Sequence, residues 1–247
     1  MYINDTHIVF YLLAAIIGLG VGQFVDWMNE RIPEKKKVFS GDLLRRYKID
    51  FKPNYILMLI TSIMYISLIY NYGVQDNIIG NLNLIKYAIL TPMLISAFVI
   101  DYRHQIIPNR LNLTIFEVGI VIAFLYGISN VAITIDMLLG LVAGVGIFLV
   151  ITLIGGLLYG KDSMGLGDVK FIGVLGLYFG LTKIIAISII AVLLGAISAL
   201  IMLITKRKKG NEHMPFGPYI VIAAFICIFV PFETITTVLT TILTLGM

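Results

Sequence analysis

Long apolar runs alternate with short polar connections along the whole chain. A helix needs about 20 apolar residues to cross a bilayer, and the runs are of that order. The pattern therefore predicts an all-α fold, a polytopic integral membrane helical bundle with about eight transmembrane helices. The sixth run is short and Gly-rich, and the eighth is interrupted by Pro231. The eight runs cover residues 8–25, 55–72, 84–101, 111–128, 134–158, 169–182, 184–205 and 216–245.

The basic residues lie almost entirely in alternate connections, with Lys86 and Lys183 as the exceptions. Basic loops stay on the cytoplasmic side of a membrane. The distribution predicts that both termini are outside and that the long polar connection, residues 26–54, is cytoplasmic. A wrong number of spans would scatter the basic residues over both sides, so the alternation supports eight.

Composition agrees with a membrane protein. The chain has 247 residues, of which 59% are hydrophobic and 13% charged, whereas soluble domains carry about 25% charged residues. A soluble globular fold and a disordered chain are therefore excluded. The single cysteine, Cys227, excludes an internal disulfide framework and a four-cysteine zinc site. The net charge of +4 reflects the orientation of the loops, and no nucleic-acid partner is predicted.

Two acidic residues stand out because charges near hydrocarbon are unfavourable and so indicate functional sites. Asp101 ends the third run and Asp168 precedes the sixth, which places both at the cytoplasmic face. Two nearby carboxyl groups in a poorly solvated site share a proton, as in aspartic proteases. Gly165 and Gly167 allow close backbone approach of a substrate beside Asp168. The pattern thus favours an aspartyl dyad.

Charge pattern alone leaves two other interpretations open. Asp168 could be a helix N-cap and Asp101 could pair with Arg103. A small ion or proton transporter could use both acids together with Glu117 in the fourth run, although transporters usually place their charges near the midplane. Glu117 could also be a polar partner within the bundle or a group supporting the dyad. Asp136 is expected at the outer interface.

Small residues at helical spacing predict close helix contacts in the C-terminal part. The pairs Gly140–Gly144 and Gly176–Gly180 have the spacing that lets two helix backbones approach. His104 and His213 have no metal-binding spacing around them, and no metal site is predicted.

Three sequence elements resemble the type IV prepilin peptidases, membrane aspartyl proteases of the Gly-x-Gly-Asp class. They are Asp101 with Ile107-Pro108-Asn109, Gly165-x-Gly167-Asp168-x-Lys170, and Met214-Pro215-Phe216-Gly217-Pro218-Tyr219. The resemblance implies that Asp101 and Asp168 are the catalytic pair. It also implies that the surrounding motif residues bind substrate or shape the site: Gly165, Gly167, Lys170, Pro108, Asn109, Pro215 and Gly217.

The resemblance further implies an activity, removal of the short basic leader from pilin-like or pseudopilin precursors at the cytoplasmic face of the cell (inner) membrane. Proteolysis by two carboxyl groups needs no cofactor. Presenilin and signal-peptide-peptidase proteases share the Gly-x-Gly-Asp element, but they carry a Tyr-Asp pair and a Pro-Ala-Leu element. This chain has Ile100-Asp101 and Pro215-Phe216-Gly217 instead. The oligomeric state is not predicted.

The N-terminal region resembles the family less closely. We expect residues 1–83 to be a two-helix region and residues 84–247 a six-helix peptidase core. Gln23 and Asp26 stand where the family commonly has Ser and Asn. Many members carry two Cys-x-x-Cys zinc pairs in the following loop, in the part linked to S-adenosylmethionine-dependent N-methylation. Loop 26–54 has no cysteine, so no zinc is expected there, and methylation with S-adenosylmethionine is left open.

Overall fold

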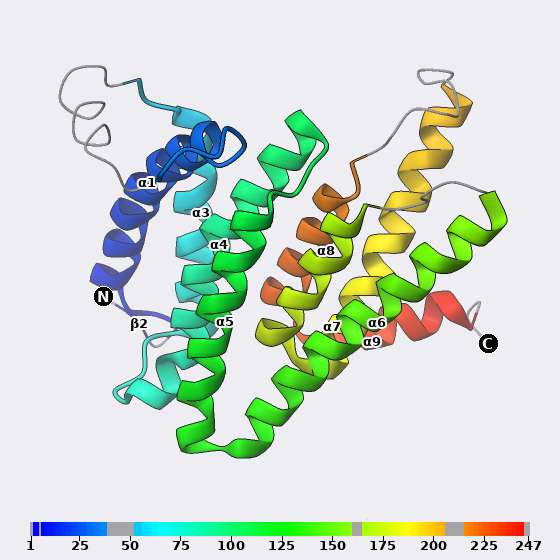
Figure 1. Cartoon of the computed structure of the whole chain (residues 1–247). Helices are drawn as coiled ribbons and strands as arrows, with labels where there is room; N and C mark the ends of the chain where they lie inside the picture. Colours follow the sequence, from blue (N-terminus) through cyan, green and yellow to red (C-terminus); the bar gives the residue numbers. More distant parts are fainter. Residues whose placement is uncertain (1, 5, 39–51, 160–164, 206–214, 245–247) are drawn as a thin grey trace. The chain divides into compact units, whose positions relative to one another are not determined.

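The computed structural model describes residues 2–4, 6–38, 52–159, 165–205 and 215–244, which are mostly helical (Figure 1). The elements are β1 Tyr2–Ile3, β2 Thr6–His7, α1 Ile8–Arg31, α3 Tyr55–Tyr72, α4 Ile78–His104, α5 Asn109–Ser129, α6 Val131–Tyr159, α7 Leu166–Ile204, α8 Gly217–Phe229 and α9 Phe232–Leu243. Six helices within the described part are long and apolar enough to cross a membrane. The predicted all-α membrane bundle is confirmed. The middle of loop 26–54, the basic run 206–209 and Met214 lie outside the described residues.

The chain forms two compact units, residues 1–100 and 101–247, which divide inside α4. In the first unit, α1 and α3 pack backbone to backbone. A Cβ on Gly18 would lie 2.5 Å from Ser62 Cα, and one on Gly22 would lie 2.5 Å from Met58 Cα. Only residues without a side chain allow two helices to approach so closely. The predicted boundary between residues 83 and 84 stays a prediction.

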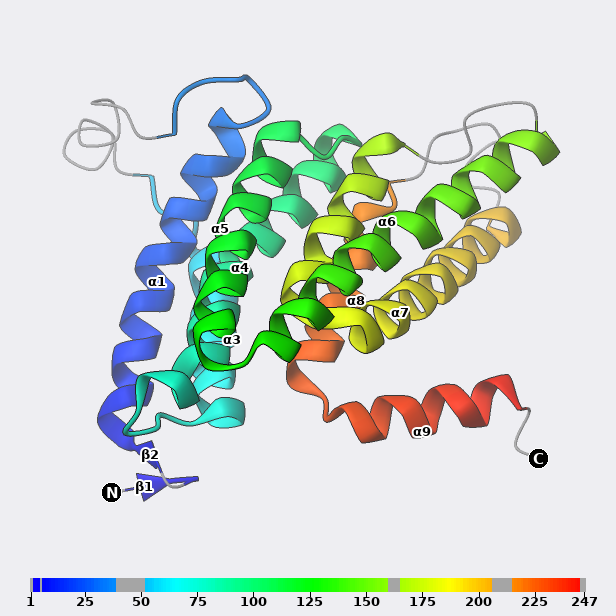
Figure 2. The same ribbon diagram turned by 60° about the horizontal axis from the view of Figure 1, so that its bottom comes forward.

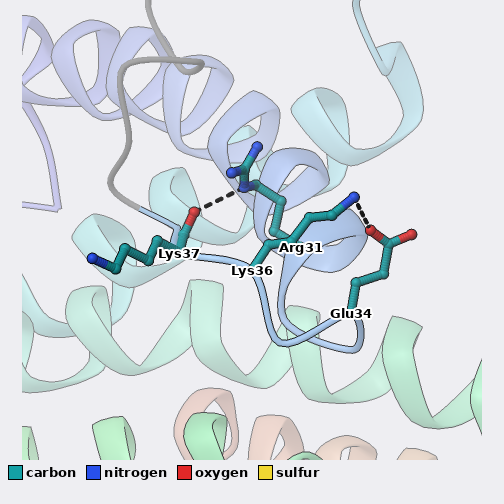
Figure 3. Close-up of polar contacts among 4 residues, drawn as sticks. All are labelled: Arg31, Glu34, Lys36 and Lys37. Atoms are coloured by element: carbon teal, nitrogen blue, oxygen red, sulfur yellow. Dashed lines mark hydrogen bonds and ion pairs between the residues drawn. The ribbon is translucent and has the colours of Figure 1, made fainter.

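A turn after α1 holds several of the charges in the first unit (Figure 3). Arg31 donates from Nε to the Lys37 carbonyl at 2.8 Å, and its guanidinium lies 4.4 Å from the Trp27 ring centroid. Lys36 forms an ion pair with Glu34, and the hydrogen bond between them lowers the pKa of the Glu34 carboxyl below its ordinary value. The turn therefore fixes the start of the polar connection at the end of α1.

In the second unit, α6 and α7 make the close contact that the glycine spacing predicts. A Cβ on Gly140 would lie 2.5 Å from the carbonyl oxygen of Gly176, and one on Gly144 would lie 2.7 Å from that of Ile172. Both glycine pairs therefore lie in one helix–helix interface. This interface holds the first half of α7, which begins with the turn that carries Asp168, against α6.

Helix α7 is two helices joined at Gly180, which has φ 72° and ψ 178°. Only glycine adopts that conformation readily. The Leu181 N–H donates to Asp136 Oδ1 at 3.1 Å, so a carboxylate from α6 caps the second half. The ribbon changes direction there, between its yellow-green and yellow parts (Figures 1 and 2). The halves match the predicted runs 169–182 and 184–205, and Asp136 has a structural role beyond the interfacial one expected of it.

The eighth predicted run, 216–245, is two helices in the structure. Val230 is extended and Pro231 comes after it, so the helical hydrogen-bond ladder stops between α8 and α9. Helix α9 turns away from α8 (Figure 2) and buries Ile235 and Leu239, one helical turn apart. The predicted interruption at Pro231 is confirmed, but the run is a short apolar helix followed by an amphipathic one, and not one span.

Candidate active site

Asp101 is placed by the end of α4. It lies three residues before the helix ends at His104, and Gln105 comes next with φ 55°. The Gln105 N–H donates to the Asp101 carbonyl at 2.8 Å, which is the hydrogen bond of a left-handed helix cap. This cap reverses the chain toward α5 and leaves the Asp101 side chain buried, with 3% of its surface exposed.

Asp168 is placed by the beginning of α7. Gly165 is the N-cap residue, and its carbonyl accepts the Asp168 N–H at 3.0 Å. The alternative that Asp168 is itself the N-cap is therefore wrong, although a carboxylate in the first helical turn is favoured by the helix dipole. Gly165 has φ −68°, so the glycine here is not required by a positive φ.

A backbone hydrogen bond connects the motif at residues 214–219 to Asp101. The Gly217 N–H, in the first turn of α8, donates to Asp101 Oδ2 at 2.8 Å. A Cβ on Gly217 would lie 2.7 Å from that oxygen, so only glycine fits there without displacing the carboxylate. The start of α8 thus directs a backbone donor, at the positive end of a helix dipole, to one member of the dyad.

Both carboxyl groups line one cavity of about 280 Å³, which has room for several water molecules. The structure thus brings the two candidate catalytic residues together with most of the predicted site residues. Two of the predicted site residues do not line the cavity. Pro108 is the N-cap residue of α5, and Gly217 donates the backbone hydrogen bond to Asp101. The lining residues are Asp101, Gln105, Ile106, Ile107, Asn109, Gly165, Leu166, Gly167, Asp168, Lys170, Pro215 and Phe216.

Lys170 is hydrogen-bonded across the cavity edge. Its Nζ donates to Asn109 Oδ1 at 3.2 Å, and both side chains are exposed. Two residues predicted from separate motifs are therefore direct partners. Lys170 also lines the cavity, where its ammonium group can meet a substrate carbonyl or carboxylate.

Several lining residues carry no polar signal in the sequence, and one important neighbour was missed. Ile106, Leu166 and Phe216 are apolar and look like ordinary span residues. Asn112 was also missed, although it lies three residues after Asn109 on the same helix face and is a polar residue in an apolar run. That spacing was a signal that could have identified it.

The remaining polar candidates lie apart from the cavity lining. Glu117 is exposed on α5, which does not support its predicted role as a partner within the bundle. His104 is exposed at the end of α4, and His213 lies outside the described residues. Among the residues that the structure describes, no group of three or more His, Cys, Asp or Glu side chains could hold a metal ion.

Gln23 and Asp26, the positions that differ from the resembled family, take part in a local hydrogen-bond network. Gln23 is 4% exposed; it donates to the Lys52 carbonyl and accepts the Asn54 N–H, both at 2.9 Å. Asn54 caps α3 and donates from Nδ2 to Asp26 Oδ1 at 2.7 Å. These side chains hold the end of the polar connection against α1.

Comparison with known proteins identifies the family. The type IV leader peptidase family profile matches residues 88–200, which include both aspartates. A prepilin leader peptidase/N-methyltransferase of Xanthomonas campestris pv. campestris is 31% identical over 215 residues, covering 84% of this chain and 69% of that protein. The chain belongs to the type IV leader peptidase family. The predicted membership and the prediction of a peptidase enzyme are confirmed, and the presenilin-type and transporter alternatives are disfavoured.

Other leader peptidases match a smaller part of the chain. Proteins with the same name from Neisseria gonorrhoeae and Pseudomonas aeruginosa are 28% and 33% identical over 171 and 140 residues. These matches cover 69% and 57% of this chain, but the chain spans only about half the length of those leader peptidases, 55% and 47%. No solved structure matches the chain.

Proposed function

We propose that this leader peptidase cleaves the short basic leader from pilin-like or pseudopilin precursors at the cytoplasmic face of the cell membrane. One observation carries the proposal: Asp101 from α4 and Asp168 from α7 line the same cavity, although 67 positions separate them. All three motifs that resemble the family meet at this cavity. The name of the relatives, prepilin leader peptidase, supplies the substrate class.

The two carboxyl groups have different surroundings, which suggests a division of roles. Both carboxyl groups lie at the start of a helix, but Asp101 also accepts the Gly217 N–H at 2.8 Å, which stabilises its negative charge further. We assign it as the general base that takes a proton from the attacking water. Asp168 carries the shared proton and donates it to the scissile carbonyl oxygen. Collapse of the tetrahedral intermediate breaks the C–N bond: the leaving amine takes the proton that Asp101 accepted, and the hydroxyl proton returns to Asp168 as the C=O bond forms again.

The membrane location suits a substrate that is itself anchored by one apolar helix. Such a helix lies beside the spans while its leader reaches the cavity between the starts of α5, α7 and α8. The proposed cytoplasmic position of this cavity is based on the basic connections, which flank both aspartates. Water enters from the same side, so hydrolysis does not require a path through hydrocarbon.

The dyad is tested with Asp101→Asn and Asp168→Asn in the purified full chain, using a pilin-like precursor as substrate. Each amide is expected to abolish cleavage, because neither can exchange the proton that the mechanism moves. Glu233→Gln, an exposed acid at the start of α9, is the matched control and is expected to cleave normally. Full cleavage by either Asn variant would overturn the dyad.

Methylation of the new N-terminus is a separate question in the same assay. Mass spectrometry of the product, with S-adenosylmethionine present, reports leader loss and a methyl group as independent mass changes. Loss of the leader without the added methyl mass assigns this chain peptidase activity alone.

A further inference from the structure

A buried amide connects α5 to the segment that carries Asp168. Asn112 is 4% exposed, and its Nδ2 donates to the Gly167 carbonyl at 3.3 Å. Gly167 immediately precedes Asp168, so this hydrogen bond fixes the peptide from which the carboxyl group extends. Asn112 is not part of the cavity lining.

A second hydrogen bond lies one turn earlier on α5. Asn109 and Asn112 are three residues apart, and so are their partners on α7, Lys170 and Gly167. Residues three apart lie on the same helix face. The two hydrogen bonds therefore lie on either side of Asp168 in the sequence and align the first turns of the two helices.

The backbones also meet at this point, so the alignment does not depend on side chains alone. A Cβ on Gly167 would lie 3.4 Å from the Ile107 carbonyl oxygen, just before α5 begins. The Asp168 segment is therefore held between the residues leading into α5 and the amide of Asn112.

The energetics of Asn112 argue against a purely stabilising role. Its Oδ1 is buried and accepts no hydrogen bond from the residues that the structure describes. A buried acceptor that is left unsatisfied destabilises a fold by more than one neutral hydrogen bond stabilises it. A leucine of similar shape should therefore preserve or increase stability. The remaining role of the Asn112 amide is to orient the Gly167 peptide through its hydrogen bond.

We propose that Asn112 is a positioning residue of the peptidase, which sets the approach of the Asp168 carboxyl group to Asp101 and to the scissile carbonyl. The proposal rests on the proposed function. A displacement of about 1 Å at a catalytic group can cost roughly a hundredfold in rate. Because Asn112 does not line the cavity, substrate binding is not expected to depend on it.

The test compares Asn112→Leu with wild type in the reconstituted full chain, measuring kcat, KM and the thermal unfolding midpoint. The leucine variant is expected to lose about a hundredfold in kcat, with KM unchanged and an equal or higher unfolding midpoint. Ser188→Ala is the matched control. Ser188 is 3% exposed on α7, and its hydroxyl donates within its own helix to the Ile184 carbonyl, so kcat should stay at the wild-type value.

The outcomes separate this proposal from the proposed function. Wild-type kcat in Asn112→Leu overturns the positioning role and leaves the dyad intact. A fall in kcat accompanied by a lower unfolding midpoint shows a structural role and also overturns it. If the leucine variant does not assemble, Asn112→Ala is judged by the same two criteria. Absence of cleavage by wild type would instead contradict the proposed function itself.

Discussion

Gly217 shows how a residue without a side chain can control a catalytic group. Its N–H is 2.8 Å from Asp101 Oδ2, and a Cβ there would lie 2.7 Å from the same oxygen. Gly217→Ala is expected to displace the carboxylate and lower kcat by about a hundredfold, as measured with a pilin-like precursor. A wild-type kcat in Gly217→Ala would show that displacing the Asp101 carboxylate does not reduce catalysis.

The control for Gly217→Ala is another glycine in the second unit. Gly146 lies in α6, and a Cβ there would meet nothing within 4 Å. Gly146→Ala should leave kcat unchanged and should stabilise the helix by up to about 1 kcal/mol, because alanine has the higher helix propensity. Equal loss of activity in both variants would indicate a general effect of the substitution.

The sequence identified most residues around the cavity but not how they touch. Asp101, Asp168 and the glycines were predicted because charge is scarce and the motifs are distinctive. The contact from Gly217 to Asp101 spans 116 positions, and no local pattern encodes a contact at that separation. The spacing from Asn109 indicated that Asn112 faces the same side of the helix, but its partner, the Gly167 carbonyl 55 positions away, is not encoded locally.

At the scale of elements, the turn inside α7 depends on two residues from different helices. Gly180 supplies the left-handed backbone and Asp136 caps the following turn through Leu181. Asp136→Ala is expected to lower stability by about 1 kcal/mol, the usual loss when a helix cap is removed. The measurement is the thermal unfolding midpoint in detergent.

Asp136→Asn is the matched control for this cap. Asparagine retains an oxygen acceptor of the same reach and caps helices about as well as aspartate. The prediction is contradicted if the Asn and Ala variants unfold at the same temperature. A shared loss would mean that the carboxylate charge, and not the hydrogen bond to Leu181, stabilises the turn.

The apolar runs predicted the helices well because the bilayer imposes a length on each of them. The run 55–72 matches α3 to the residue. The break in the last run at Pro231 was predicted, but Pro231 alone does not fix the direction of α9 after α8. The chain direction after a break depends on packing, which the local sequence does not contain.

At the scale of the whole molecule, the orientation in the membrane decides whether the cavity can meet a cytoplasmic leader. Helix α5 has 21 residues, and at 1.5 Å per residue its length is about 30 Å, the thickness of a hydrocarbon core. Asn109, at its start, lines the cavity, and Ser129 ends it. The two ends of α5 are therefore expected to lie on opposite sides of the membrane.

Single-cysteine labelling tests the orientation in sealed spheroplasts. Cys227 is 3% exposed, and Cys227→Ala provides a cysteine-free background. A membrane-impermeant maleimide should label Ser129→Cys from outside and should reach His104→Cys only after permeabilisation, because His104 lies at the cavity end. Labelling of His104→Cys in sealed spheroplasts would place the dyad outside. That result would contradict the positive-inside assignment and, with it, cleavage at the cytoplasmic face.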